Sequence, residues 1–131
     1  MLSPTKAVKF KSKIEFFLVE QAPDHVIAKM PVTESMLNPF GTVHAGALLW
    51  LADMSSTTLA LTKVKPGEGG RGYPLAIDLH AVFMSNQSDG EILAESRFVR
   101  TGRRVIVIRT RITGEHEKLL LDVTTTHIPA V

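Results

Sequence analysis

The apolar stretch between His44 and Lys63 is the longest regular segment of the chain and constrains the fold most. Its first half, residues 45–52, is almost wholly apolar, and its second half carries Asp53 and several hydroxyl side chains. Eighteen residues of this composition make a poor membrane span and a good buried helix. The sequence therefore predicts one long core helix.

Flanking residues set the bounds of this helix. Thr42 is a predicted N-cap, the helix is expected over Val43–Val64, and Lys65-Pro66-Gly67 ends it. The loop that follows carries a GxGxxG pattern at Gly67, Gly69 and Gly72. A dinucleotide site needs a strand before this pattern and a helix after it. The expected order here is the reverse, so we set a dinucleotide site aside.

Strands are predicted on both sides of the helix. Loose apolar alternation from Lys13 to Val32, broken by the turn Ala22-Pro23-Asp24, predicts a hairpin, and Pro31 to Gly41 is predicted as a loop. Four further strands joined by explicit turns are expected at Leu75–Met84, Glu91–Arg100, Arg104–Ile112 and Leu119–Thr126. This order predicts a single α+β domain over residues 1–131, with an antiparallel sheet wrapped around one helix, as in a hotdog fold.

The strand segment Val105–Ile108 is apolar on both of its faces. Such a strand is expected to be covered on both sides, and the one helix covers only one of them. A second copy of the chain is the simplest cover for the other side. Unpaired edge strands also argue against a monomer. We therefore expect a homodimer or a dimer of dimers.

Charge and composition exclude several classes of function. The formal net charge is only +2, and the basic clusters lack the interleaved aromatic residues of a nucleic-acid module. The absence of cysteine excludes disulfides, zinc thiolate sites and thiol nucleophiles. No apolar run of signal-peptide length lies in Met1–Val8, so we expect a cytoplasmic protein without a membrane partner. The clusters are Lys6, Lys9, Lys11 and Lys13, and Arg97, Arg100, Arg103, Arg104, Arg109 and Arg111.

These basic clusters have two interpretations. The first is that they lie on solvated strand faces. The second is that the arginine cluster binds a small molecule that carries phosphate, because guanidinium groups match phosphate geometry.

Asp53 is the most informative residue for function. It is the only ionisable group across the 18 residues of the core helix, and burying an unpaired carboxylate is costly. One interpretation is structural, with Asp53 in a solvated notch or bonded to Ser56 and Thr57. The other is catalytic, and we favour it.

His44 and Ala45 lie at the expected start of the helix. Free backbone N–H groups and the positive end of the helix dipole favour an anion there, such as the oxygen of an acyl-transfer intermediate. A capping or packing role for His44 fits equally well. Asp53 lies on the opposite helix face and about 13 Å further along the axis. If both are catalytic, two chains must form the site together.

Other catalytic patterns do not occur in the sequence. There is no HExxH, no GxSxG and no Walker loop. Asp78 and His80 are expected on one face of a strand, but a metal site needs a third ligand. We therefore expect neither a metal ion nor another cofactor.

The segment Asn38–Gly46, Asn-Pro-Phe-Gly-Thr-Val-His-Ala-Gly, is followed by Leu51-Ala52-Asp53. With these residues the chain resembles the hotdog-fold acyl-CoA thioesterases of the phenylacetate-degradation (PaaI-like) group. The resemblance covers most of the chain and includes the spacings of six residues from Asn38 to His44 and nine from His44 to Asp53. It implies an oligomeric enzyme that cleaves an acyl-CoA thioester without a cofactor.

The resemblance also implies a role for each matching residue. Asp53 would act across the dimer as general base or nucleophile, and Thr57, one turn later, would help to orient water. Ala45 and Gly46 would offer backbone N–H groups to the thioester carbonyl.

The remaining matches would bind or position the substrate. His44 and Asn38 would position the thioester or the water around it. Arg103 and Arg104 would bind the phosphates of CoA, because guanidinium groups donate two parallel hydrogen bonds.

The chain departs from the family pattern at two positions. Ala45 stands where the family usually has glycine, so a Cβ atom lies where the thioester approaches. Ala76 stands at a substrate-binding position where some relatives have serine, so that hydroxyl is missing. The departure at Ala45 keeps a non-catalytic acyl-CoA binding protein as an alternative to the thioesterase. A hotdog dehydratase is a third possibility, although that chemistry usually places its histidine and carboxylate differently.

Overall fold

The computed structural model describes residues 14–130, so the lysine cluster from Lys6 to Lys13 lies outside the described residues. The described chain forms one α-helix, six strands and three short 3-10 turns. The main elements are β1 (Phe17–Gln21), β2 (His25–Pro31), α1 (Ala45–Ala60), β3 (Pro74–Phe83), β4 (Glu91–Thr101), β5 (Ile106–Thr113) and β6 (Leu119–Pro129). The 3-10 turns are Glu34–Met36, Glu68–Gly70 and Glu115–Glu117.

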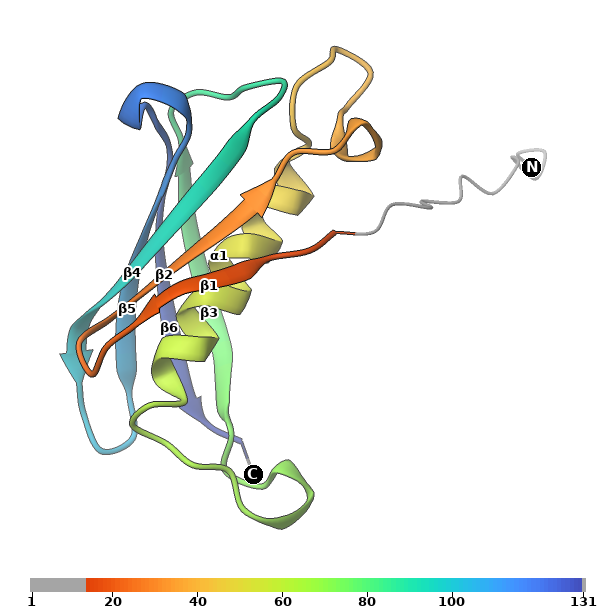
Figure 1. Ribbon diagram of the computed structural model, residues 1–131. Coiled ribbons are helices and arrows are strands. Elements are labelled where there is room, and N and C mark those ends of the chain that lie inside the picture. Colours follow the sequence, from red (N-terminus) through yellow and green to blue (C-terminus); the bar gives the residue numbers. More distant parts are fainter. Residues whose placement is uncertain (1–13, 131) are drawn as a thin grey trace, which may run out of the picture.

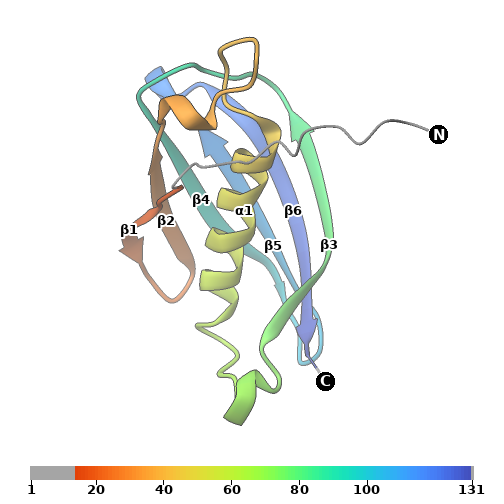
Figure 2. The ribbon, with the colours of Figure 1, turned by 90° about the vertical axis from the view of Figure 1, so that its right-hand side faces the viewer.

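The six strands form one antiparallel sheet in the order β1-β2-β4-β5-β6-β3. The sheet curves around α1, which lies along the concave face between β1 at one edge and β3 at the other (Figures 1 and 2). The predicted α+β architecture is confirmed, and so is the predicted order of two strands, one helix and four strands along the chain. The glycine-rich loop does follow the helix and precede a strand.

The hydrophobic core lies between α1 and the concave face of the sheet. Burial of each large apolar side chain there contributes about 1.5–3 kcal/mol. Within residues 14–130, no helix is long and apolar enough to cross a membrane. The buried residues of α1 are Ala47, Leu48, Leu51, Ala52, Ser55, Ser56, Leu59 and Ala60.

The helix begins at Ala45 rather than Val43, and the prediction of Thr42 as its N-cap is wrong. His44 is the N-cap: its backbone is extended, and its Nδ1 accepts a hydrogen bond from the Ala47 N–H at 3.0 Å. The imidazole therefore takes the role that a hydroxyl or carboxyl oxygen usually has at this position.

Two hydrogen bonds between Val43 and the β3–β4 loop hold the chain extended just before the helix. The Val43 N–H donates to the Gln87 carbonyl at 3.1 Å, and the Asn86 side chain donates to the Val43 carbonyl at 2.8 Å. Asn86 lies 43 residues further along the chain, so no local pattern predicts this contact. The helix also ends earlier than predicted, at Ala60 rather than Val64.

Exposed apolar side chains mark β3 and the outer face of β5. In β5 the outward-facing Val107 is only half-buried, and Val105, just before the strand, is 39% exposed. The described chain therefore leaves the predicted second cover of Val105–Ile108 incomplete. The exposed large apolar residues on and next to β3 are Tyr73, Leu75, Ile77, Leu79, Val82, Phe83 and Met84.

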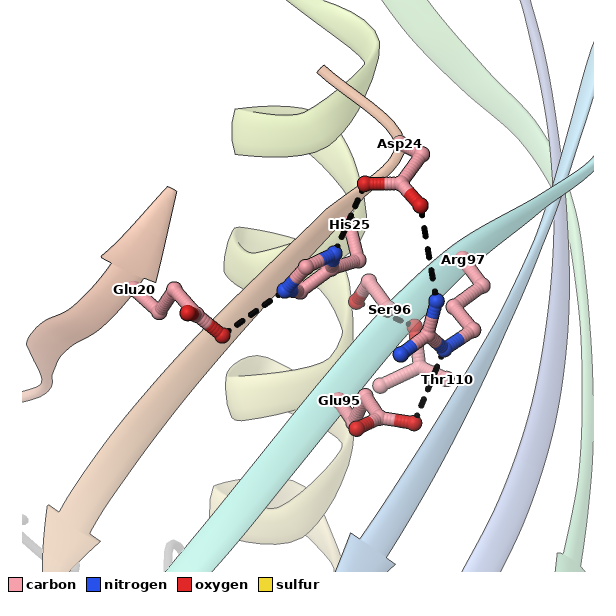
Figure 3. A network of polar contacts seen from close by, with 7 residues as sticks. All are labelled: Glu20, Asp24, His25, Glu95, Ser96, Arg97 and Thr110. Carbon is pink, nitrogen blue, oxygen red and sulfur yellow. Dashed lines mark hydrogen bonds and ion pairs between the residues drawn. The ribbon is translucent and has the colours of Figure 1, made fainter. Parts of the chain in front are cut away.

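A cluster of charged side chains fastens the β1–β2 hairpin to β4 (Figure 3). The ring of His25 lies between Glu20 and Asp24, at 2.7 and 2.8 Å from their carboxylates. Asp24 also reaches Arg97 of β4 at 3.7 Å. Hydrogen bonds to Glu20 and Asp24 raise the pKa of His25, against the opposing effect of desolvation.

This raised pKa predicts a stability change with a definite sign. A histidine whose folded-state pKa is raised stabilises the fold below its unfolded-state pKa, and the contribution is lost as the pH rises through the folded-state pKa. We expect His25→Gln to lower the urea midpoint clearly at about pH 5.5 and much less at about pH 9. His116→Asn, in the exposed turn Glu115–Glu117, serves as the control. An equal loss at both pH values would contradict this role of His25.

Candidate functional site

Asp53, Thr57 and Ala76 line one hollow between α1 and the start of β3. The hollow has a volume of about 250 Å³ and is also lined by Met54, Tyr73, Pro74 and Leu75. Asp53 and Thr57 lie one helical turn apart, so they share a face of α1. The structure therefore brings together three of the residues expected at the site.

The Asp53 side chain is half-buried at this hollow. The Ser56 hydroxyl donates to the backbone carbonyl of Asp53 at 3.1 Å and not to its carboxylate. Among the described residues, no side chain forms an ion pair or hydrogen bond with the Asp53 carboxylate. The structural interpretation in which Ser56 binds that carboxylate is wrong, and the group is available to a molecule in the hollow.

The start of α1 presents backbone N–H groups to the surface. The N–H groups of Ala45 and Gly46 belong to the first helical turn, which has no intrahelical acceptors for them, and both residues are exposed. A Cβ atom on Gly46 would lie 3.1 Å from Nδ1 of His44. Glycine at position 46 therefore leaves room for the capping imidazole, in addition to leaving the surface open.

Asn38 shapes the loop before the helix. Its Oδ1 accepts hydrogen bonds from the N–H groups of Phe40 and Thr42, at 2.9 and 3.2 Å, and its Nδ2 donates to the Thr42 hydroxyl at 2.9 Å. These bonds fix a tight turn in which Gly41 has a φ of +83°. The structure thus gives Asn38 a role within its own loop, and its contact with a substrate stays a prediction.

One chain does not bring the helix start and the hollow together. His44 precedes Asp53 by nine residues, which is about 13 Å of helix. The helix begins beside the loop after β2 and ends beside the loop that leads into β3, at opposite ends of the molecule (Figure 1).

Arg103 and Arg104 lie in the β4–β5 turn and are exposed. Both line a small void that they share with Pro74 and His127. Because Pro74 also lines the hollow of Asp53, the two arginines lie near that hollow.

Two residues near the hollow are not expected from the sequence. Tyr73 lines the hollow directly. Its position after the glycine-rich loop does not predict that it would lie there. His127 is buried on β6, with Val123 and Thr125 on the same face. The alternation of β6 predicts this shared face, but it does not predict that α1 and β3 cover a histidine.

The fold and these residues define a class: hotdog-fold enzymes with a half-buried carboxylate beside β3 and an open helix N-terminus. A family model described as the Thioesterase superfamily matches residues 40–121. The chain belongs to this superfamily and is a thioester hydrolase.

Known relatives agree with this assignment. The chain is 30% identical to the human "acyl-coenzyme A thioesterase 13", over 85% of this chain and 77% of the relative. It is 27% identical to the "1,4-dihydroxy-2-naphthoyl-CoA hydrolase" of Listeria monocytogenes, over 82% of each chain. A hypothetical thioesterase of Streptococcus pneumoniae, solved with coenzyme A, has the same fold: its TM-score is 0.78 at 19% identity, over 88% of this chain and 86% of that chain.

The cap geometry separates two possible roles of His44. Removing an N-cap side chain costs about 1 kcal/mol, and asparagine is itself a good N-cap. We expect His44→Ala to lower the free energy of unfolding by about 1 kcal/mol and His44→Asn to restore it. Urea denaturation measures both. If His44→Asn is as unstable as His44→Ala, the ring does not act as a cap; if it is stable but slow, the imidazole also acts on the substrate.

Proposed function

We propose that the protein hydrolyses an acyl-CoA thioester to a free acid and CoA, with Asp53 acting on water or on the thioester itself. The observation that carries this proposal is the half-buried Asp53 carboxylate, which faces the hollow without a partner among the described residues.

As a general base, Asp53 takes a proton from water while the water oxygen attacks the thioester carbonyl carbon. The tetrahedral intermediate then collapses, the C–S bond breaks, and the CoA sulfur leaves with a proton. As a nucleophile, the carboxylate attacks the carbonyl carbon, the C–S bond breaks and the CoA thiolate leaves, and water then cleaves the resulting anhydride to the free acid. In both routes Ala45 and Gly46 stabilise the carbonyl oxygen as it becomes negative.

CoA is the proposed carrier of the acyl group. Arg103 and Arg104 lie near the hollow and are exposed, so their guanidinium groups are free to meet phosphates. Two relatives are named as CoA thioesterases or hydrolases, which supports the same carrier here. We also place the chain in the PaaI-like group of thioesterases, on the basis of the motif Asn38–Gly46 and Asp53.

A homodimer would complete the proposed site. The helix start and Asp53 lie about 13 Å apart in one chain. β3 lies at the edge of the sheet, has no strand on its outer side and carries exposed apolar residues. Phe40, in the turn held by Asn38, is 91% exposed and offers further apolar surface for a second copy. A dimer of dimers, a cytoplasmic location and a single domain over residues 1–131 stay predictions.

A non-catalytic acyl-CoA binding protein is the second candidate. Ala45 is the observation that favours it, because its Cβ stands at the exposed helix start where the thioester would approach. Tight acyl-CoA binding without release of CoA would identify such a protein.

The first test measures free thiol released from short, medium, long and aromatic acyl-CoAs. We expect Asp53→Asn to lower kcat by about 10²- to 10⁴-fold, the usual loss for a positioned acid or base. Asp89→Asn, an exposed carboxylate in the β3–β4 loop, is the matched control and should leave kcat unchanged. Undiminished turnover by Asp53→Asn would rule out the assigned role.

A second test asks whether two chains share one site. Ala45→Pro removes one proposed N–H donor, and proline is well tolerated at the first helical position. Its predecessor His44 already has the extended ψ of 148° that proline requires. Loss of an oxyanion donor costs about 10²- to 10³-fold in kcat.

Asp53→Asn and Ala45→Pro chains are then co-expressed with different tags. If each site uses both chains, the mixed dimer contains one site with both defects and one native site. A randomly mixed sample then recovers about a quarter of the wild-type activity. No recovery, despite isolation of the mixed dimer, would mean that one chain supplies both groups.

A further inference from the structure

Asp78 and His80 are polar residues of β3 that the proposed mechanism does not use. Both are exposed, and they share one face of the strand because they lie two residues apart. Strand pairing places them opposite Thr126 and Thr124, on the face of β6 that turns away from α1. Within residues 14–130, neither the Asp78 nor the His80 side chain forms a hydrogen bond or an ion pair.

The strand that carries these two residues has an open outer side. β3 lies at the edge of the sheet, and no strand pairs with it there (Figure 2). It is ten residues long and exposes large apolar side chains, among them Ile77 and Leu79. A long apolar edge pairs readily with another strand. An identical strand from a second copy complements this edge, because Asp78 and His80 lie one position to either side of Leu79.

Two-fold symmetry restricts how two copies of β3 can pair. In an antiparallel pair, the residue on the two-fold axis lies opposite its own copy. From Asp78 to Phe83 the strand pairs with β6 without a bulge, so its side chains alternate regularly. An axis at Leu79 then places Asp78 of each copy opposite His80 of the other. The dimer contains two such pairs, with Cβ atoms about 4.5–5.5 Å apart.

The neighbouring registers on the same face lack these pairs. An axis at Asp78 places two carboxylates directly opposite each other, where they repel. An axis at His80 places two imidazoles opposite each other and leaves both Asp78 carboxylates without a donor. An imidazole carries at least one N–H in either protonation state, and a carboxylate accepts hydrogen bonds. These side chains therefore favour the register centred on Leu79.

The geometry of the proposed site favours the same register. Hydrogen bonds between Val43 and the loop after β3 hold the helix start beside the end of that strand. The hollow of Asp53 lies at the other end of β3, beside residues 74–76. An axis at Leu79, near the middle of β3, places the end of one strand opposite the start of the other. It therefore brings the helix start of one copy towards Asp53 of the second.

We propose that two copies of the chain pair along β3 about a two-fold axis at Leu79, and that each Asp78 carboxylate accepts a hydrogen bond from the His80 ring of the other copy. These two contacts select the register in which the chains share a site. The inference rests on the homodimer of the proposed function. It adds to that function the residues that align the two chains.

Exchange of the two residues tests the pairing. His80→Asp places carboxylates opposite each other and should raise the dimer dissociation constant by about 10- to 100-fold. Asp78→His removes both contacts without adding a charge repulsion between carboxylates, and should raise the constant by about 2- to 30-fold. The double variant Asp78→His/His80→Asp restores both pairs in this register and should dimerise like the wild type.

Sedimentation equilibrium near neutral pH measures all four proteins. A double variant that dimerises as weakly as His80→Asp would overturn the proposal, and so would single variants whose dissociation constants are unchanged. Because both residues are exposed, these substitutions leave the core of each chain intact.

A disulfide cross-link locates the axis directly. The chain has no cysteine, so Leu79→Cys introduces a single thiol that faces its own copy and should give a covalent dimer on mild oxidation. Val82→Cys is the matched control: this exposed position of β3 lies three residues from the axis, so its two copies would be about 20 Å apart and should not cross-link.

Cross-linking through Val82 and not through Leu79 would overturn the register. Both measurements report association and do not depend on turnover. A dimer that cross-links through Leu79 but releases no CoA would refute the proposed function and keep this inference, whereas an active enzyme without this cross-link would do the opposite.

Discussion

The burial of one face of α1 in the concave side of the sheet is the interaction on which the rest of the structure depends. Ala47, Leu48, Leu51 and Ala52 are all fully buried there, which fixes the rotation of the helix about its axis. Because helix geometry is regular, that rotation also fixes which residues lie at the border of the buried face. Asp53 is placed at this border, beside β3, by the packing of its neighbours and not by hydrogen bonds of its own carboxylate.

The same packing explains why the proposed site would need two chains. A straight helix holds its N-terminus and Asp53 at a fixed separation of about 13 Å, so one helix does not supply both groups to one carbonyl. An antiparallel second copy, joined along the edge strand β3, would bring the start of one helix to the middle of the other. The exposed apolar residues of β3 and the exposed Phe40 are consistent with such a contact.

Much of this architecture follows from local sequence patterns. The apolar stretch after His44 predicts the core helix, and turn residues such as Thr101-Gly102-Arg103 predict the hairpins, because the signals lie within a few residues of the elements that they define. The start of the helix was predicted wrongly. Thr42 has the chemistry of an N-cap, but Val43 accepts a hydrogen bond from the Asn86 side chain and donates one to the Gln87 carbonyl, which keeps the chain extended there, and His44 becomes the N-cap.

The residues of the candidate site could be predicted from the sequence, but the residues that surround them could not. Motif spacing singles out Asp53, and the structure places Thr57 and Ala76 in the same hollow. The burial of His127 has no local signal, because the alternation of a strand does not show which of its two faces is covered. The helix covers the concave face, and the pairing of β6 with β3 places His127 opposite Ala76, 51 residues earlier in the chain.

A crystal structure of the protein with a non-hydrolysable acyl-CoA analogue, in which a methylene group separates the carbonyl from the sulfur, tests the central claim most directly. The account predicts that the analogue's carbonyl oxygen contacts the N–H groups of Ala45 and Gly46 in one subunit, while its carbonyl carbon faces Asp53 of a second copy. An analogue bound within a single chain, or bound away from Asp53, would contradict it.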